Sequence, residues 1–446
     1  MQKKTLKSIT ELGTKKTLTS VILVVNAFIW YYVILHFLEE ATKSFPSLSV
    51  SSLTIWGFHF SGLILSAFVG ALAAKKIERN KFLISWMLLG VISSFSLTAI
   101  ETSNVILTSL ISLLLGVSLG IGMPTCMNYF SDTSSVENRG RTSGIALLAS
   151  GIGIVAFSVV SINNAIILGI ILAVWRTTSL LIFLSVKPSA TMIPKRNVTY
   201  KDILSQRSFI LYFVPWIMFS LINYLVAPIS PTSTSDIPGS ISIVGLGFLG
   251  IFAGIGGFLI DSLGRKFVAI VGFVMLGIGS ALLGISTKNL YILYFNAVTS
   301  GTAWGLLLVL FILTIWGDLS YISTSDKFYA IGASPFFLSA FLGVTVGNYI
   351  LSQFPNSSGL FSFGAFFLFL AVLPLLYAPE TLNEKTIMAR QFKTYIEKAQ
   401  KIAQKETRKN DNQDSEETEK ADEEAKQVTQ ESHEYEEARK LAEKYY

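Results

Sequence analysis

The chain has 446 residues, of which 51% are hydrophobic and only 14% are charged, and its mean hydropathy is +0.56. A soluble protein of this length has too little interior to bury that much apolar surface, so the composition excludes a soluble protein and predicts a multi-spanning membrane protein. The net charge of +6 would suit nucleic-acid binding, but the Lys and Arg residues lie in short loops between apolar runs, where they set membrane topology instead.

Apolar runs of about twenty residues recur along the chain, long enough to cross ~30 Å of hydrocarbon as helix. No cleavable signal peptide is evident before Thr17. The sequence therefore predicts an all-α membrane protein with twelve transmembrane helices in two parallel-repeat six-helix halves. The predicted spans are 18–38, 53–74, 82–100, 104–127, 142–163, 165–186, 208–229, 240–260, 267–286, 290–315, 328–351 and 360–378.

The distribution of positive charge predicts the orientation of these spans. With the N-terminus in the cytoplasm, nearly all Lys and Arg residues of the membrane part lie inside; only Lys43 and Lys288 lie outside, and Arg176 is undecided. We therefore expect a multi-pass protein of the cell membrane with both termini cytoplasmic. The expected units are an N-terminus at 1–17, a six-helix half at 18–186, a basic linker at 187–207, a second half at 208–379 and a charged tail at 380–446.

The two halves share an internal repeat with an offset of 186 residues. Arg79 and Arg265 differ by this number, as do Asp132 and Asp318. The same offset joins Arg141 to Lys327, Trp30 to Trp216, and Gly70 to Gly256. Five matches in one frame indicate a duplicated half, and two parallel six-helix halves around a midplane site are a transporter architecture.

Several loops carry a recognisable motif. The stretch GGFLIDSLGRK (256–266) has the pattern G-x-x-x-D-x-x-G-R-K, which resembles the cytoplasmic loop motif of the major facilitator superfamily. The run YFSDTSSVENRG (129–140) resembles the pattern Y-x-S-E-x-x-P-x-x-x-R-G of the sugar-porter branch, with Asp132 for Glu and Ser135 for Pro. Residues 379–381 match its PET signature, whereas LFILTIWG (310–317) lacks its P-x-x-W. The resemblance covers 18–381 and implies a metabolite transporter of the superfamily.

Acidic residues at the cytoplasmic ends of spans 4, 8 and 10 predict an ionic gate. By the resemblance, Asp132 would pair with Lys327 at the start of span 11, and Asp318 with Arg139 or Arg141 at the start of span 5. Pairs that form in one conformation and break in another would bias an inward–outward equilibrium. The alternative is that these charges only set topology and keep the loops solvated. The expected gate residues are Arg79, Asp132, Arg139, Arg141, Asp261, Arg265, Lys266, Asp318 and Lys327.

The predicted gate is asymmetric between the two halves. Where the second half has Asp261, the first half has Lys75. A lysine there can only repel a basic neighbour or signal topology, whereas the aspartate can attract one. We therefore expect span 8 to contribute to closure in a way that span 2 does not.

Ionisable residues inside spans are costly and indicate function by default. Arg176 lies at mid-depth if span 6 is 165–186, where it must face a cavity or a partner; alternatively it is an anchor near the outer face, like the W-R that opens this span in sugar porters. His36 and His59 can titrate near neutral pH, or are simply hydrogen-bonded. Span 1 carries Asn26 where proton-coupled sugar porters carry an acid, which speaks against carboxylate coupling by that route.

Aromatic and amide side chains in the spans suit a neutral polyol, because rings stack on sugar faces and amides hydrogen-bond to hydroxyls. The alternative for the aromatic residues is ordinary packing or an interfacial belt. The expected cavity residues are Asn26, Trp30, Arg176, Trp216, Asn223, Tyr224 and Trp304.

No metal, nucleophile or phosphate-binding constellation is found, so we expect no enzymatic activity, no metal and no cofactor. The predicted function is secondary active or facilitative transport of a small polar organic solute (sugar, polyol or organic anion) by alternating access, with a proton as a candidate coupling ion. The expected partners are this solute and the lipid bilayer, with no nucleic acid, around a monomeric transport unit. The alternative is a transporter-like sensor that signals through its tail. That acidic tail is either a solvated segment without a transport role or a contact for another protein or for the basic loops.

Overall fold

The computed structural model describes residues 2–382 apart from 44, 47, 101–103, 161–163, 187–197, 227–238, 321–322 and 354–357. The first part of the predicted linker and the tail beyond residue 382 lie outside the described residues. Eleven described helices are long and apolar enough to cross a membrane, and Arg207–Ile222 is a shorter apolar helix. The chain is therefore a multi-pass, helical membrane protein.

The first half contains seven helices for six predicted spans. They are α1 (Gln2–Thr42), α2 (Val50–Ala73), α3 (Arg79–Phe95), α4 (Val105–Gly120), α5 (Met123–Thr133), α6 (Arg139–Val160) and α7 (Ala165–Val186). The span predicted at 104–127 is divided into α4 and α5 and continues to Thr133. Pro124 explains the division, because it lacks an N–H group and lies in the first turn of α5.

The second half repeats this plan after a short helix, α8 (Tyr200–Leu204), in the linker. Its helices are α9 (Arg207–Val226), α10 (Gly239–Leu263), α11 (Arg265–Ile285), α12 (Leu290–Leu308), α13 (Ile315–Leu319), α14 (Asp326–Gln353), α15 (Ser358–Leu370) and α16 (Val372–Tyr377). A π-helical segment, Val309–Thr314, joins α12 to α13, so the span predicted at 290–315 ends four residues later.

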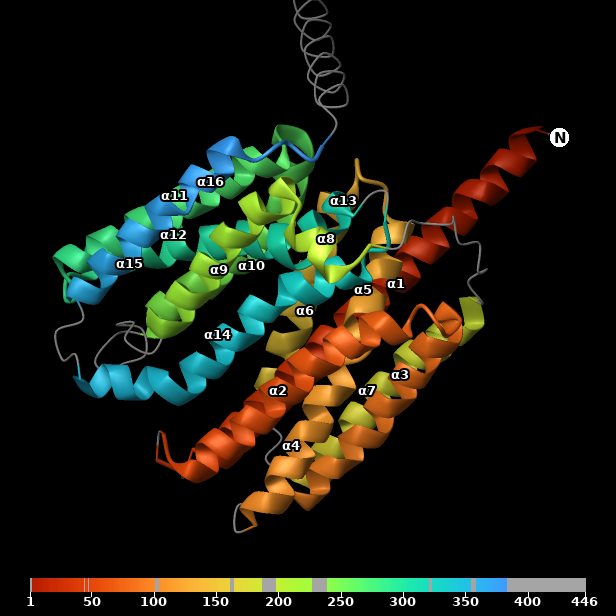
Figure 1. Cartoon of the computed structure of the whole chain (residues 1–446), viewed down its shortest axis with the longest axis horizontal. Helices are drawn as coiled ribbons and strands as arrows, with labels where there is room; N and C mark the ends of the chain where they lie inside the picture. Colours follow the sequence, from red (N-terminus) through yellow and green to blue (C-terminus); the bar gives the residue numbers. More distant parts are fainter. Residues whose placement is uncertain are drawn as a thin grey trace, which may run out of the picture. The chain divides into compact units, whose positions relative to one another are not determined.

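Helix packing follows the same pattern in both halves. In the first half α2 packs on α4 and α3 on α7; in the second, α10 packs on α12 and α11 on α15 (Figure 1). The contacts between the halves are also equivalent, because α14 meets α2 and α6 meets α10. These matched contacts are what a duplicated six-helix unit would produce.

Small residues allow the two halves to approach closely at α6 and α10. A Cβ atom on Gly257 would lie 2.4 Å from the carbonyl oxygen of Gly140 and 3.0 Å from the Cα of Gly144. Only residues without a side chain fit at this crossing, as in other close membrane-helix contacts. Gly257 of the span-8 loop motif therefore serves the close contact between α10 and α6.

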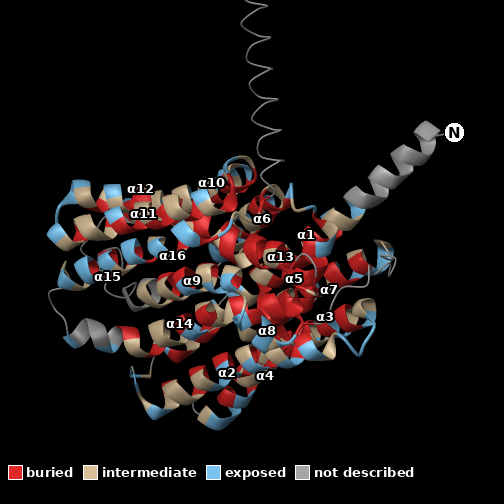
Figure 2. Cartoon of the chain, turned by 45° about the horizontal axis from the view of Figure 1, so that its top comes forward, coloured by how far each residue is buried: buried red, intermediate tan, exposed pale blue. Residues whose placement is uncertain are grey.

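Buried residues gather where the helices meet, and exposed residues cover their outward faces (Figure 2). Many exposed side chains are large and apolar, among them Leu65, Ile152, Val155, Ile243 and Phe363. Such a surface would be a liability in water but is what contact with lipid chains requires.

Candidate gate and inter-half site

A buried ion-pair network joins the two halves at the predicted cytoplasmic end. Asp318 of α13 pairs with Arg139 at the start of α6 and with Arg265 at the start of α11, where Nε lies 2.8 Å from Oδ2. Arg265 also pairs with Asp261 at the end of α10, at 3.1 Å. The four side chains are 0–5% exposed. Two arginines and two aspartates thus neutralise one another at the point where α6 of the first half meets the second half.

Asp261 holds the first turn of α6 through its backbone. Its Oδ1 accepts a hydrogen bond from the N–H of Gly140 (3.0 Å), and its Oδ2 accepts one from the N–H of Arg141 (2.9 Å). The first N–H groups of a helix have no partners within the helix and carry partial positive charge, so a carboxylate is stabilised there. The Arg141 side chain is 42% exposed, and its Nε lies 3.8 Å from Oδ2. Besides its ion pair with Arg265, Asp261 therefore binds the start of α6 through backbone N–H groups and not through the Arg141 side chain.

The two arginines of the network also bind backbone carbonyls. Arg265 donates from Nη1 to the carbonyl of Ile260 (3.1 Å) and from Nη2 to that of Val136 (2.5 Å). Arg139 donates from Nη2 to the carbonyl of Ser131 (2.9 Å). The guanidinium has five donors in a fixed plane, so it can serve a carboxylate and a carbonyl at the same time, which an ammonium does less well.

Glu380 closes the same end and was not among the predicted gate residues. Its Oε1 accepts from the N–H of Arg265 (2.9 Å) and its Oε2 from the N–H of Lys266 (3.1 Å), so it caps the start of α11. Gly264 precedes this cap with φ +100°, and a Cβ there would lie 2.5 Å from Glu380 Oε2. Lys266 donates from Nζ to the carbonyl of Leu376 (2.7 Å). The PET signature was the sequence signal for Glu380, although it did not indicate what the residue binds.

A second ion pair is related to the first by the 186-residue offset. Arg79 Nη1 lies 2.6 Å from Asp132 Oδ2, and this pair is the equivalent of Arg265 with Asp318. The arginine and aspartate side chains are 13% and 24% exposed. The structure thus gives Asp132 a partner other than the expected Lys327.

Lys327 binds the linker instead. Its Nζ donates to the carbonyl of Val198 (2.6 Å) and lies 4.9 Å from the centre of the Tyr200 ring. The linker backbone before α8 covers the start of α14 and provides a carbonyl for the ammonium group. The basic composition of the linker at 187–207 does not by itself predict this contact.

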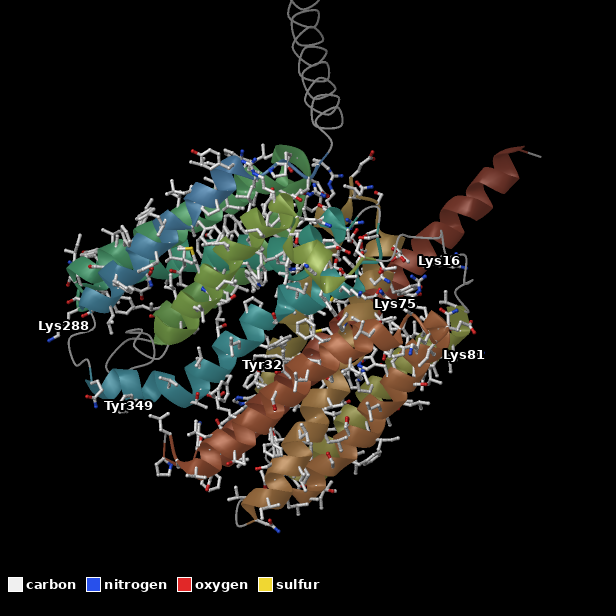
Figure 3. The ribbon with its side chains drawn as sticks, in the orientation of Figure 1. Lys16, Tyr32, Lys75, Lys81, Lys288 and Tyr349 are labelled. Atoms are coloured by element: carbon white, nitrogen blue, oxygen red, sulfur yellow. The ribbon has the colours of Figure 1, made fainter. Side chains whose placement is uncertain are left out.

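Lys75, the equivalent of Asp261, faces Lys327, the equivalent of Arg141. Burial, and next the Lys327 ammonium, lower the pKa of Lys75 to about 8, against a smaller opposing effect of Asp326. Figure 3 shows Lys75 at the end of the molecule that carries Lys16 and Lys81, away from Lys288. Asp261 lies beside the basic Arg141 and Arg265 in the second half, whereas the equivalent Lys75 in the first half lies beside the like-charged Lys327.

Arg176 lies near the middle of α7 and is fully buried inside the first half. Its Nη1 donates to Asn26 Oδ1 (3.2 Å), and its guanidinium lies 5.1 Å from the Trp30 ring and 4.5 Å from the Trp86 ring. Nε and Nη2 have no hydrogen-bond partner among the described residues. Of the two placements considered, the structure shows the mid-helix one, with the aromatic faces compensating part of the charge.

The candidates in the second half form an aromatic cluster. Trp216 on α9 stacks on Phe311 (5.0 Å), Phe219 (5.2 Å) and Phe336 (5.8 Å), and its indole N–H donates to the carbonyl of Gly332. Trp304 on α12 joins through Phe219, 4.7 Å away. Asn223 and Tyr224 lie on α9, but their side chains are outside the described part of the structure.

His59 and Tyr31 lie where the two halves face each other. Phe336 of the aromatic cluster contacts Phe337 on α14, and Phe337 contacts Tyr31 on α1, with ring centres 6.1 Å apart. The Tyr31 hydroxyl lies 3.3 Å from His59 Nε2, and His59 Nδ1 lies 3.0 Å from the carbonyl of Ser112. Of the two histidines considered, His59 is therefore buried at the inter-half contact, whereas His36 is exposed on α1.

Comparison with known proteins shows the fold. No protein-family model and no curated protein matches the chain. Among solved structures, the proton:xylose symporter XylE of the major facilitator superfamily, bound to 6-bromo-6-deoxy-D-glucose, is similar with a TM-score of 0.65 and 14% identity, over 83% of this chain and 97% of that one. The human organic anion transporter MFSD10 (TETRAN) is similar with a TM-score of 0.63 and 12% identity, over 81% of this chain and 99% of that one.

Proposed function

We propose that this chain, which has the fold of the major facilitator superfamily transporters, carries a small polar organic solute across the cell membrane by alternating access between its two halves. The observation that carries this proposal is the buried network of Arg139, Asp261, Arg265 and Asp318 between the halves. A permanent scaffold would be as stable with apolar residues there, because a buried ion pair stabilises little more than good apolar packing. Charges suit a contact that must open and close, because water solvates and so stabilises each charge once the two sides separate.

The described conformation is closed at the end that carries this network. The distribution of Lys and Arg along the sequence supports a cytoplasmic location for that end and for the N-terminus. Opening toward the cytoplasm would separate α6 from α10 and α2 from α14, so the network would break as a unit. Closing would form it again while the opposite end opens.

The solute class follows from the two groups of candidate residues. Trp304, which is only partly buried at the edge of the cluster around Trp216, offers a ring face of the kind that stacks on a sugar or polyol. Arg176 is fully buried in the described conformation, and its positive charge would favour an organic anion once a movement within the first half exposes it. The two similar structures, one of a sugar symporter and one of an organic anion transporter, make both classes reasonable probes.

The test is uptake of labelled solutes into liposomes that contain the purified full chain. The probes are D-xylose, D-glucose, a hexitol, lactate and succinate, each measured with and without a protonophore. We expect saturable uptake of at least one probe, absent from protein-free liposomes. Absence of uptake for every probe would contradict transport and favour the sensor alternative.

A pair of glycine substitutions links uptake to the movement of the halves. In Gly144→Leu the new side chain would collide with α10, because even a Cβ there lies 2.8 Å from the carbonyl of Ala253. Gly151→Leu on the same helix is the matched control, since nothing lies within 4 Å of a Cβ at that position. We expect Gly144→Leu to lose most uptake and Gly151→Leu to retain it. Equal uptake by both variants would contradict closure of α6 on α10 as a step of transport.

A further inference from the structure

We propose that His59 is the proton-binding site of this transporter, and that its protonation favours separation of α2 from α14. The inference rests on the proposed function, since it identifies the residue through which a proton would act on alternating access. Three observations carry it: the hydrogen bonds of the imidazole, its surroundings, and its place at the inter-half contact.

The hydrogen bonds of His59 satisfy both ring nitrogens of the neutral imidazole. The Ser112 carbonyl can only accept, so Nδ1, 3.0 Å away, must carry the hydrogen. Nε2 is then the acceptor for the Tyr31 hydroxyl at 3.3 Å. A second proton on Nε2 would remove this acceptor and force the tyrosine hydroxyl to turn.

The surroundings of His59 oppose a positive charge. The side chain is fully buried, and its ring contacts are Trp56 (6.1 Å) and Phe60 (5.2 Å) on α2 and Tyr31 (5.9 Å) on α1. The contact from α4 is the Ser112 carbonyl. Tyr31 is the one titratable group that the described contacts bring to the ring, and no carboxylate is among them. A charged imidazole without a carboxylate in an apolar site is costly, so the closed conformation selects the neutral form.

Because His59 lies at the contact between α2 and α14, its preference for the neutral form depends on whether these helices are in contact. α14 lies over the histidine and its partner: Phe337 contacts Tyr31 at 6.1 Å, and Phe341 contacts Phe60, the residue next to His59, at 6.1 Å. His59 lies closer along α2 to Val50 than to Ala73, so when α2 and α14 separate at the end opposite the ionic network, these rings leave and water can reach the imidazole. The proton is therefore bound preferentially after opening and must leave before closing, which is the linkage that a proton-coupled cycle requires.

The spacing of α2 and α14 provides a test that needs no solute. Spin labels at Val50→Cys on α2 and Tyr349→Cys on α14, both exposed positions, report the distance between these helices in a Cys126→Ala background. We expect the distance distribution in lipid nanodiscs to shift toward longer values as the pH falls from about 8 to about 5. The His59→Gln variant should lose this shift, and His36→Gln, which changes an exposed histidine on α1, should retain it.

A second variant and a direct measurement keep the proposal testable if His59→Gln does not fold. Tyr31→Phe removes the hydroxyl that Nε2 accepts from, so the opening transition should move to higher pH. NMR of 15N-histidine-labelled protein should show neutral His59 with hydrogen on Nδ1 at pH 8 and the charged ring at low pH; the His59→Gln spectrum assigns its signals. A pH-dependent distance that survives in His59→Gln, or a wild-type distance that does not change with pH, would overturn the proposal.

Uptake measurements separate this inference from the proposed function. If uptake occurs but neither a pH gradient nor a protonophore changes it, the transporter stands and proton coupling through His59 is wrong. If no probe is taken up, transport is wrong, while the spin-label and NMR titrations still decide whether His59 controls the α2–α14 contact. Loss of gradient-driven uptake in His59→Gln, with passive exchange retained, would support both.

Discussion

The two repeat-related ionic clusters at the predicted cytoplasmic end have the same plan but different chemistry. Arg265 with Asp318 and Arg79 with Asp132 are equivalent pairs with N–O distances of 2.8 and 2.6 Å. The second-half pair has no exposed side chain, is extended by Arg139 and Asp261 and contacts the other half; the first-half pair is partly exposed. Duplication has thus kept the positions of the charges, while the second-half cluster is the more buried and the more extended of the two.

Asp261 and its equivalent Lys75, which lie next to these two pairs, differ in the sign of their charge as well as in burial. Asp261 caps the start of α6 and attracts Arg141, whereas Lys75 faces Lys327. At this end, Asp261 has basic neighbours, whereas Lys75 has a like-charged neighbour, Lys327, whose ammonium donates to the Val198 carbonyl. An end with one strong and one weak side can open without breaking two equally strong networks.

The largest expected effect comes from removing the charge at the centre of the strong cluster. Asp318→Asn leaves Arg139 and Arg265 buried with one carboxylate fewer, which should destabilise the described conformation by about 3–5 kcal/mol. Thermal unfolding in detergent should show a lower Tm. The matched control is Asp132→Asn in the exposed pair, where about 1 kcal/mol or less is expected. Equal shifts for the two variants would contradict the asymmetry.

The next effect concerns the helix starts at equivalent positions. Gly264→Ala forces a Cβ into a backbone with φ +100° and against Glu380 Oε2, so it should cost about 1–3 kcal/mol and loosen the cap of α11. Its equivalent in the first half is Glu78, the N-cap of α3, which has φ −55° and makes no side-chain cap hydrogen bond. Glu78→Ala should therefore change the Tm little. Hydrogen exchange at Arg265 and Lys266 amides would locate the loss, and unchanged protection there would contradict the capping role of Glu380.

Reversing the charge on the weak side should strengthen closure. Lys75→Asp would replace the contact between two ammonium groups by an attractive pair with Lys327, worth about 1 kcal/mol at this exposed site, or roughly a fivefold shift toward the closed state. The measurement is the rate at which a cysteine at the gate reacts with a polar maleimide. Lys81→Asp is the control, because Lys81 lies at the same end but pairs with Glu78 instead (3.2 Å). A faster reaction in Lys75→Asp would contradict repulsion at this site.

The smallest effect is a pH dependence on the alkaline side. Because the pKa of Lys75 is about 8 in this conformation against an ordinary 10.5, the conformation disfavours the proton on Lys75. The free-energy cost of keeping Lys75 charged in this conformation is fully present below pH 8. This cost is relieved as the pH rises toward 10.5, so closure should become more favourable over that range. Lys75→Gln should remove this dependence while leaving the acid response assigned to His59. The maleimide assay between pH 8 and 10 distinguishes the two, provided the rates are corrected for thiol ionisation.

The sequence predicts the structure best where one residue type has a single physical role. Apolar runs gave the helical spans, because a bilayer leaves the backbone few alternatives to helix. The 186-residue offset placed Arg79 and Asp132 in the same relation as Arg265 and Asp318, although Lys327 was expected as the partner of Asp132. The choice between the two cations depended on where the linker before α8 lies, and no local pattern encodes that position.

The candidate cavity shows the opposite case. Asn26, Trp30 and Arg176 were grouped with Trp216 and Trp304 because all are polar or aromatic residues within spans, but the structure places the first three inside the first half and the tryptophans of α9 and α12 in a separate aromatic cluster. Hydropathy gives the depth of a residue and not the direction in which its side chain points. His59, one of two candidate histidines, is distinguished only by the helices that surround it.

The sequence by itself determined the class of the protein, the number and order of its spans and the duplication. These depend on local length, polarity and spacing, which the chain carries at each position. The tertiary structure alone decided which charges meet, which histidine is buried between the halves and which carboxylate caps which helix. Those facts depend on how helices far apart in sequence pack against one another. The stretch GGFLIDSLGRK shows both: its motif was legible in the sequence, but only packing showed that Asp261 binds the start of α6 and that Arg265 binds Asp318.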